Sequence, residues 1–366
     1  MISFVWDKVR RLDPILFVCT SILSIMSLLV LFGARNSEFG SMRTVIMQLA
    51  MTLAGIVFMI ILANIDFSHL PTWFYTAVLG LSAVLLVLLL FVGENAGTNQ
   101  NWIKIPIVNI SIQPSEFVRA SFILTFAKHL STVKDSVNRP KTLIVLLLHA
   151  GLITGLLLLT GDLGMALVYC GIIAVMLFCT GLSLWYFLAG IVLVILLFPV
   201  LWEFLAEYQK ERILIGFNPD LDPMDVGMQQ IKSRAAIAGG GFFGRGVEGA
   251  GSYKGMYACL TDFYFATYAE MFGFFGCLVL IGIMVIIVVR LIVLARRSPE
   301  PYGALVCAGV IGMMVVQTVE NIGMCLCLLP VVGITLPFLS AGGSSILSIY
   351  MVFGLVHGTT VKKSKL

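Results

Sequence analysis

Long apolar runs separated by short polar stretches dominate this chain of 366 residues. A run of about 20 apolar residues is long enough to cross the hydrocarbon core of a bilayer as a helix. The pattern predicts ten such helices, at residues 14–33, 45–65, 72–92, 114–131, 143–160, 163–180, 183–202, 264–294, 302–327 and 342–358. We therefore predict an all-α polytopic membrane protein, with residues 1–366 forming a single domain.

Composition supports this class. Hydrophobic residues make up 59% of the chain and charged residues 11%, too few to cover the surface of a soluble protein of this size. The net charge of +4 is not clustered as in nucleic-acid-binding proteins, so we expect no nucleic-acid partner. The eight cysteines lie mostly inside apolar runs and the four histidines are scattered, which predicts buried small side chains and no metal site.

Lys and Arg in the short connections predict the orientation, because cytoplasmic loops of membrane proteins are enriched in both. With the N-terminus inside, the cytoplasmic side collects Lys8, Arg10, Arg11, Lys128, Lys134, Arg139, Lys141, Arg290, Arg296, Arg297, Lys362, Lys363 and Lys365. The short loops of the other side hold Arg35, Arg43 and Lys104. Both termini are therefore predicted to be cytoplasmic. The first run lacks a small-x-small cleavage site, so we expect a retained span.

Residues 203–262, between the seventh and eighth predicted helices, form the one long polar segment. It contains eight carboxylates, six Lys or Arg and ten glycines, and the orientation makes it an extracytoplasmic loop. Asp262 ends this segment. Its carboxylate could cap the following helix, or it could act as a general base at the membrane surface. In a continuous helix, Glu270 would lie ~12 Å deeper than Asp262, where a carboxylate needs a partner or a function.

Three other predicted outward segments carry candidate site residues. Arg119 lies one turn into the fourth helix and could pair with Glu116, grip a phosphate, or do both. Asp162 could cap the sixth helix or face a substrate. Trp102 and Lys104 could anchor a loop at the interface, or form a sugar-stacking surface beside a phosphate-binding cation.

Two glycine-rich stretches are also notable. Gly239–Gly241, followed by Gly244 and Gly246, could form a flexible linker or a flap whose amides meet an anion. Residues Gly244-Arg245-Gly246-Val247-Glu248-Gly249 match G-x-G-x-x-G, but no βαβ unit surrounds them, so we reject a dinucleotide site. Residues 330–345 are rich in Pro, Gly and Ser, and could line a cavity or form a turn with small residues for helix packing.

In chain order, several short motifs together resemble the SEDS family (shape, elongation, division and sporulation), which includes RodA and FtsW. They are Gln113-Pro114-Ser115-Glu116, Gly161-Asp162-Leu163-Gly164, Arg212 with Phe217 and Pro219, Gly227-x-Gln229 with Ser233, Thr261-Asp262-Phe263 with Glu270 and Gly273, Gln317 with Asn321-Ile322-Gly323, Pro330-x-x-Gly333, Pro337-Phe338 and Gly342-Gly343-Ser344-Ser345. The resemblance covers nearly the whole chain.

The resemblance implies a peptidoglycan glycosyltransferase of the bacterial cytoplasmic membrane that serves cell elongation, division or sporulation. Such an enzyme polymerises lipid II, an undecaprenyl-pyrophosphate disaccharide-peptide, together with a class B penicillin-binding protein. The essential aspartate of the family corresponds to Asp262, as general base. The chemistry requires no certain cofactor, although a divalent cation (Mg²⁺ or Mn²⁺) could assist the leaving pyrophosphate. We assign substrate binding to Trp102, Lys104, Glu116, Arg119, Asp162, Arg212, Gln229, Ser233, Lys254, Glu270, Ser340, Ser344 and Ser345.

The sequence departs from the family pattern close to Asp262. The family usually has Pro-Glu-x-His there, whereas this chain has Tyr257-Ala258-Cys259-Leu260. The usual Gln-Pro-Asp is Thr160-Gly161-Asp162, Met165 stands where Thr is common, Met271 replaces a second Glu, and Ala341 replaces Tyr or Gly. These departures also fit a non-catalytic scaffold of a cell-wall synthesis complex, and polar residues lining a cavity also fit a flippase or transporter of lipid II.

Overall fold

The computed structural model describes residues 12–96, 99–105, 110–224 and 227–360. Six of the basic residues used above to predict the orientation lie outside the described residues. These are Lys8, Arg10, Arg11, Lys362, Lys363 and Lys365.

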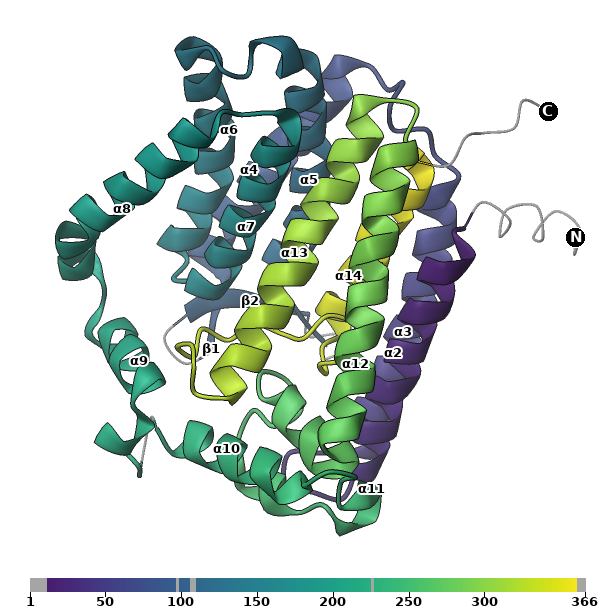
Figure 1. The fold of residues 1–366 in the computed structure, drawn as a ribbon, viewed down its shortest axis with the longest axis vertical. Coiled ribbons are helices and arrows are strands. Elements are labelled where there is room, and N and C mark those ends of the chain that lie inside the picture. The colour runs from purple at the N-terminus through teal and green to yellow at the C-terminus, as the bar shows by residue number, and fades with distance from the viewer. Residues whose placement is uncertain (1–11, 97–98, 106–109, 225–226, 361–366) are drawn as a thin grey trace, which may run out of the picture.

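Helices dominate the fold (Figure 1). The longer elements are α2 (Pro14–Gly33), α3 (Met42–Ala63), α4 (Thr72–Val92), β1 (Glu94–Ala96), β2 (Asn99–Ile105), β3 (Ile110–Ile112), α5 (Pro114–Val133), α6 (Pro140–Leu159), α7 (Leu163–Thr180), α8 (Leu184–Phe204), α9 (Glu207–Phe217), α10 (Met228–Gly240), α11 (Gly246–Gly249), α12 (Tyr264–Arg297), α13 (Pro301–Cys325) and α14 (Gly343–Thr360). Single 3₁₀ turns occupy Lys134–Ser136, Pro219–Leu221 and Ser252–Gly255.

Each predicted span corresponds to one long helix. Within the described residues, seven helices are long and apolar enough to cross a membrane: α2, α3, α4, α6, α7, α12 and α13. In α8, the apolar stretch covers Leu184–Val200. The charged residues Glu116, Arg119 and Lys128 lower the hydropathy of α5, and serines and threonines lower that of α14. The all-α polytopic membrane fold is thus confirmed.

Helix starts follow local sequence signals. Asp13 caps α2 by accepting a hydrogen bond from the Leu16 amide at 3.1 Å. Proline stands in the first turn of α5, α6 and α13, where the missing N–H leaves no helical bond unmade. In α5 that proline is Pro114, with Glu116 also in the first turn, as its motif predicts.

Both described ends of the chain lie at the same end of the bundle. The Asp13 amide donates to His357 Nδ1 at 3.1 Å, and the Asp13 carboxylate pairs with Arg290 at 2.6 Å. We call this the terminal end, and the opposite end, which carries α9, α10 and α11, the loop end. Among the seven apolar spans α13 is the most buried, with 67% of its apolar window inside the protein against 22% for α3. It packs against α5, α7, α12 and α14.

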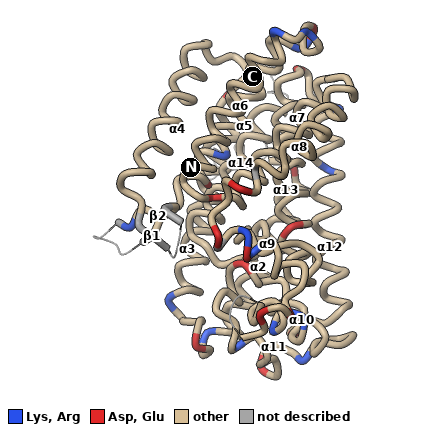
Figure 2. The backbone as a smooth tube through the Cα atoms, turned by 90° about the vertical axis from the view of Figure 1, so that its left-hand side faces the viewer, with Lys and Arg blue, Asp and Glu red and all other residues tan. Residues whose placement is uncertain are grey.

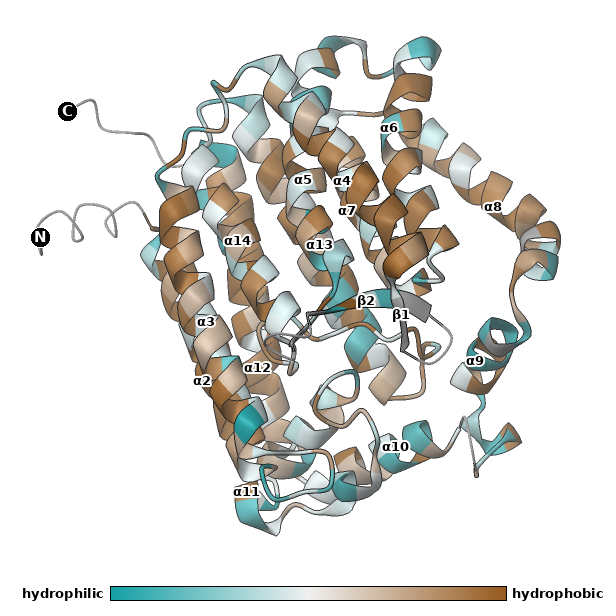
Figure 3. Cartoon of the chain, turned by 180° about the vertical axis from the view of Figure 1, so that it is seen from behind, coloured by the Kyte–Doolittle hydropathy of each residue, from teal (hydrophilic) through white to brown (hydrophobic). Residues whose placement is uncertain are grey.

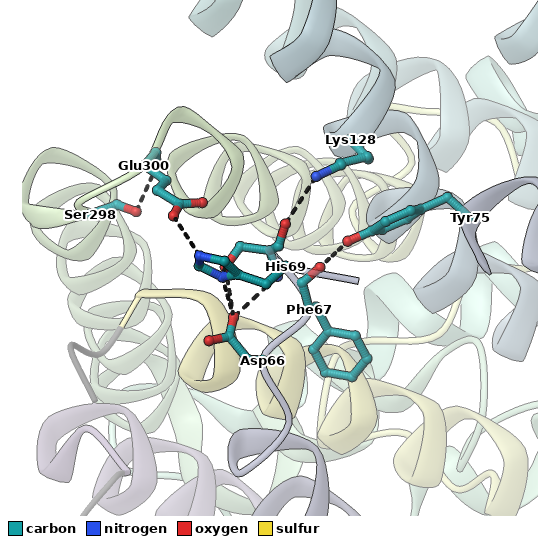
Figure 4. Close-up of polar contacts among 8 residues, drawn as sticks. Asp66, Phe67, His69, Tyr75, Lys128, Ser298 and Glu300 are labelled. Atoms are coloured by element: carbon teal, nitrogen blue, oxygen red, sulfur yellow. Dashed lines mark hydrogen bonds and ion pairs between the residues drawn. The ribbon is translucent and has the colours of Figure 1, made fainter. Parts of the chain in front are cut away.

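A polar cluster closes the terminal end (Figure 4). Lys128 donates to the Ser68 carbonyl at 2.9 Å and lies over the ring of Tyr75, which itself donates to the Phe67 carbonyl. His69 lies 3.3 Å from Asp66 and 3.8 Å from Glu300. The cluster therefore ties the α3–α4 connection to α5 and to the start of α13.

The long polar segment folds into helices rather than remaining an irregular loop. Charged residues gather around α9, α10 and α11 (Figure 2), and hydropathy changes from apolar to polar between the bundle and this region (Figure 3). The glycines after α10 serve close packing. A Cβ atom at Gly240 would lie 2.1 Å from the Ala269 carbonyl oxygen, and one at Gly244 would lie 2.2 Å from that of Met271. The stretch thus lies flat against the start of α12.

The connection between α4 and α5 contains a small sheet that the apolar pattern does not predict. Strands β1, β2 and β3 pair antiparallel in that order, with Glu94 opposite Trp102 and Lys104 opposite Ser111. Strand β2 packs against α4 and α5. The strands are short, and apolar helices come before and after them in the sequence. The alternation of polar and apolar residues along the strands is therefore too brief to stand out.

Candidate functional site

The helix that follows Asp262 is interrupted at Gly273. The interruption places the site at a different depth in the bundle from the one that a continuous helix would give. Gly273 has φ 67° and ψ −169°, so α12 consists of two helical parts, residues 264–272 and 274–297. Tyr264 donates to the Met26 carbonyl at 3.3 Å, whereas Met271 lies beside Gly33, at the end of α2. The first part therefore runs toward the loop end alongside α2. After Gly273 the chain returns, and Arg290 reaches Asp13.

This geometry corrects the expectation for Glu270. The sequence predicts a continuous helix with Glu270 deeper in the membrane than Asp262. Because the first part of α12 is re-entrant, Glu270 instead lies nearer the loop end. Asp262 is the deeper of the two. Seven residues separate the level of Met26 from the end of α2, which places the Tyr264 hydroxyl roughly 10 Å below that end.

Distant segments hold the backbone at Asp262 in place. The Asn321 side-chain amide, from α13, donates to the carbonyl oxygens of Asp262 at 2.7 Å and Ile334 at 2.8 Å. Ser340 donates to the Thr261 carbonyl at 2.6 Å. The Ala341 amide donates to the Leu260 carbonyl at 2.7 Å. Satisfied main-chain groups on both sides of Asp262 fix the direction in which its side chain leaves the backbone.

The carboxylate of Asp262 is not a helix cap. The N-cap of α12 is Phe263, and it makes no side-chain capping bond. The Asp262 side chain is partly buried. Burial raises its pKa from 3.8 to about 6, while the Arg212 guanidinium and a hydrogen bond with Thr261 act in the opposite direction. Gly333, with φ 72°, stands directly against it, because a Cβ atom there would lie 3.6 Å from Asp262 Oδ2.

Arg212 brings α9 to the same place. It lines a small cleft whose other walls come from the start of α7 and from the segment before Gly333; the other lining residues are Gly161, Leu163, Gln209, Ile213, Val331 and Val332. Gly216 lies against Pro330, where an added Cβ atom would be 2.4 Å from the Pro330 Cα atom. The structure thus brings Arg212, the Gly161 corner and residues 331–332 together, and it places Gly333 against Asp262.

Asp162 performs the capping role that its position allows. Its Oδ1 accepts from the Met165 amide at 3.0 Å, and its Oδ2 accepts from Gln113 Nε2 at 3.1 Å. Burial raises its pKa to about 6. The backbone N–H of Gln113 donates to Ser344 Oγ at 3.1 Å. Gln113 therefore joins the starts of α5, α7 and α14.

Glu116 and Arg119 form a buried ion pair. Their side chains are 2.5 Å apart, and Arg119 is fully inaccessible. Ser348, from α14, accepts from Arg119 at 2.9 Å and donates to Glu116 at 2.9 Å. Arg119 Nε and Nη1 have no protein partner among the described residues. The ion-pair interpretation is confirmed, and the guanidinium has no exposed atoms at the cleft surface.

Most of the remaining candidates bind the backbone. Gln229 accepts from the Tyr257 amide at 2.8 Å, and Ser233 donates to the Cys325 carbonyl at 2.9 Å. Glu270 is fully buried and accepts from the Gly251, Ser252 and Tyr253 amides at 2.8 to 3.1 Å. Gln229 and Ser233 therefore hold the backbone at Tyr257 and at the end of α13, whereas Glu270 holds residues 251–253.

The last four candidates occupy other surroundings. Ser345 Oγ lies 3.1 Å from Thr335 Oγ1. Trp102 is partly buried and Lys104 is exposed, both on β2. Lys254 lines a different cleft from Arg212, together with Arg35 and Arg245.

Three residues at the site are absent from the predicted set of site residues: Gln113, Asn321 and Gly333. Of the three, Asn321 is the one that the sequence could have identified, because an amide in a mostly apolar helix needs hydrogen-bond partners. Cys259, close to Asp262, is fully buried, and burial raises the pKa of its thiol to about 12. It is therefore a small apolar side chain of the core, as the cysteine pattern predicts.

Comparison with known proteins identifies the family. Residues 11–365 match the model of the FtsW/RodA/SpoVE family, described as "Cell cycle protein". Peptidoglycan glycosyltransferase MrdB of Escherichia coli K12 is 32% identical over 355 residues, covering 96% of this chain and 94% of the relative. Stage V sporulation protein E of Bacillus subtilis 168 is 32% identical over 364 residues, covering 94% and 95%.

Solved structures share the fold. One chain, from "Structural coordination of polymerization and crosslinking by a peptidoglycan synthase complex", is 28% identical, with a TM-score of 0.80 over 94% of this chain and 96% of that one. RodA of Thermus thermophilus is 24% identical, with a TM-score of 0.71 over 95% and 96%. By sequence and by fold, this chain therefore belongs to the FtsW/RodA/SpoVE family of multi-pass membrane proteins, the SEDS peptidoglycan glycosyltransferases.

Proposed function

We propose that this chain polymerises lipid II at the outer face of the bacterial cytoplasmic membrane, with the loop end outside and both termini in the cytoplasm. The observation that carries the proposal is Asp262, a recessed carboxylate that caps no helix and faces the charge of Arg212. The Lys and Arg bias of the short loops supports the orientation. Relatives named peptidoglycan glycosyltransferase support the reaction.

Asp262 acts as the general base. The acceptor sugar hydroxyl attacks the anomeric carbon of the donor, and its proton passes to Asp262. The new carbon–oxygen bond forms as the bond to the diphosphate breaks, and the leaving diphosphate takes the electron pair. A pKa of about 6 makes the carboxylate a stronger base than an ordinary aspartate while leaving it mostly ionised at pH 7.

Arg212 stabilises the charge that develops on the leaving diphosphate. Its positive charge acts on Asp262 across the cleft, so the same guanidinium is close enough to meet a phosphate bound beside the base. Among the described residues, no three His, Cys, Asp or Glu side chains gather to hold a metal ion. We therefore assign charge stabilisation to Arg212 and derive no step through a bound Mg²⁺ or Mn²⁺.

The partner that fits this reaction is a class B penicillin-binding protein, which crosslinks the strands that the chain polymerises. Support comes from the structural relative that belongs to a complex of polymerisation and crosslinking. The reaction also explains why the site is recessed. The reactive part of a lipid-linked substrate lies at the membrane surface, next to its lipid tail.

Purified protein in nanodiscs, supplied with its class B partner and lipid II, should produce glycan polymer that is visible on a gel. Asp262→Ala should abolish the polymer while the unfolding temperature stays close to that of the unchanged chain. Normal polymerisation by Asp262→Ala would refute the assignment. Transfer of lipid II across vesicles without any polymer would favour the transporter instead.

A further inference from the structure

Four phenylalanines gather on the surface where the long polar segment meets the second part of α12. Phe242 and Phe243 follow α10, and Phe274 and Phe275 begin the second part of α12. All four residues are more than half exposed, and Phe243 is the most exposed of them at 79%. The centre of the Phe242 ring lies 4.8 Å from that of Phe243 and 5.8 Å from that of Phe274. We call these four residues the aromatic tip.

Backbone hydrogen bonds join the two halves of the aromatic tip. The Phe274 amide donates to the Gly241 carbonyl at 2.9 Å, and the Phe275 amide donates to the Phe242 carbonyl at 3.0 Å. The fold therefore holds four large apolar side chains together at one place on the surface. Proteins rarely expose such a group to water, and an exposed apolar patch marks a surface that contacts a protein partner or a membrane.

The aromatic tip lies about one bilayer thickness away from the terminal end. Helix α2 has 20 residues, which corresponds to about 30 Å, the thickness of the hydrocarbon core. At its start, Asp13 pairs with Arg290 of α12 at the terminal end. At its other end, Gly33 lies beside Met271, just before the turn in α12 that leads to Phe274. The tip is therefore at the level where the hydrocarbon core ends and the lipid headgroups begin.

The aromatic tip also continues the exposed apolar surface of a helix that spans the membrane. Along α12, exposed apolar side chains follow Phe274 and Phe275 at Leu278, Val279 and Ile286. Phe242 extends the same surface, because its ring lies against that of Phe274, although it belongs to the long polar segment. The apolar faces of interfacial segments are buried at the boundary between headgroups and acyl chains. This continuity favours a lipid surface over a protein as the partner of the tip.

We propose that the aromatic tip anchors the long polar segment in the outer leaflet, at the boundary between phospholipid headgroups and acyl chains. The inference rests on the proposed function, which places the loop end outside and the base beside a lipid-linked diphosphate. The anchored segment holds the re-entrant part of α12, because the Arg245 amide donates to the Glu270 carbonyl at 2.9 Å. Asp262 lies at the other end of that part. The anchor therefore sets the height of the base relative to the headgroups.

The fluorescence of an added tryptophan tests where the tip lies, without any turnover. Phe243→Trp protein is placed in phosphatidylcholine nanodiscs, and its emission is compared with that of the unchanged chain. We expect phosphatidylcholine brominated on its acyl chains to quench most of the added emission, and acrylamide in the buffer to quench little of it. Quenching by acrylamide and not by bromine would overturn the anchor.

Tyr257→Trp is the matched control for this measurement. Tyr257 is 75% exposed, and its ring lies 5.7 Å from that of Phe39, in the connection beyond the end of α2. An added tryptophan there should respond to acrylamide and not to bromine. If bromine quenches both variants equally, the method does not separate the tip from the rest of the loop end, and the assignment of these four residues as the anchor is wrong.

A double variant tests what the anchor does. Phe242→Ser/Phe243→Ser removes two rings and leaves α12 unchanged. In nanodiscs, its KM for lipid II should rise several-fold, because the base is no longer held at the height of the substrate diphosphate. Its unfolding temperature in detergent should stay close to that of the unchanged chain, because both rings are exposed on the protein itself. Phe242→Trp/Phe243→Trp should retain the original KM. An unchanged KM in the serine variant would refute the link to the base.

The anchor and the proposed function fail separately. A protein whose added tryptophan is quenched by bromine, but which never polymerises lipid II, retains the anchor and refutes the proposed function. A protein that polymerises normally, with an added tryptophan that only acrylamide quenches, retains the function and refutes the anchor. If the class B partner shields that tryptophan from acrylamide and bromine does not quench it, the tip binds a protein and the lipid assignment is wrong.

Discussion

At the scale of single residues, three carboxylates of the loop end differ in what they contact. Asp162 accepts from the Met165 amide and from Gln113, and Glu270 accepts from three backbone amides. Asp262 makes no capping bond and interacts electrostatically with Arg212. The sequence identifies all three as notable. Only their hydrogen bonds separate the two carboxylates that support the structure from Asp262, which we propose as the base.

The raised pKa of Asp262 predicts how polymerisation depends on pH. A base works only when ionised, so the rate should rise between pH 5 and pH 7, with a midpoint near the pKa of about 6. Initial rates of polymer formation across this range would measure it. Asp162 also has a pKa of about 6, so Asp162→Asn, which retains a side-chain oxygen for the Met165 amide, is the control. If the rate of Asp162→Asn no longer falls at acid pH, the pH dependence comes from Asp162 and not from Asp262.

At the scale of elements, the break in α12 decides where the site lies. A continuous helix would leave Asp262 at the membrane surface, whereas the turn at Gly273 recesses it among the ends of α7, α9 and α13. The turn needs glycine for two reasons. Its φ of 67° is unfavourable for other residues, and a Cβ atom there would lie 2.2 Å from the Gly244 nitrogen.

Gly273→Ala should therefore destabilise the protein by more than the roughly 1–3 kcal/mol of the backbone strain alone, since the clash adds to it. We expect a lower unfolding temperature and a loss of polymerisation. Gly282→Ala is the matched control in the same element, because no atom lies within 4 Å of the added Cβ. It should leave the unfolding temperature unchanged or raise it slightly. Equal effects of both changes would contradict the re-entrant turn.

At the scale of the whole molecule, a buried polar core beneath the site joins helices that are distant in sequence. Arg119 and Glu116 in α5 share Ser348 with α14, and Ser344 at the start of α14 reaches Gln113. Such a core fixes how the helices sit against one another, because an unpaired charge inside the bundle would be costly.

Glu116→Gln should therefore destabilise the protein by about 3–5 kcal/mol, because it leaves Arg119 buried without its partner charge. Glu116→Met combined with Arg119→Met removes both charges and should recover part of that stability. Denaturation monitored in detergent would measure the change, beside the KM for lipid II. A raised KM with unchanged stability would instead show that the pair binds phosphate.

The sequence by itself determined the membrane class, the ten helices and Asp262 as the residue to test. The even number of helices also brings both ends of the chain to the same end of the bundle. Hydropathy and short motifs are local properties, so the chain order carries them. Tertiary structure decided the re-entrant turn and the uses of Asp162 and Glu270. These depend on contacts between residues such as Asp262 and Asn321, 59 positions apart, or Gln113 and Ser344, 231 apart. No periodicity within one segment specifies which distant backbone group a side chain will bind.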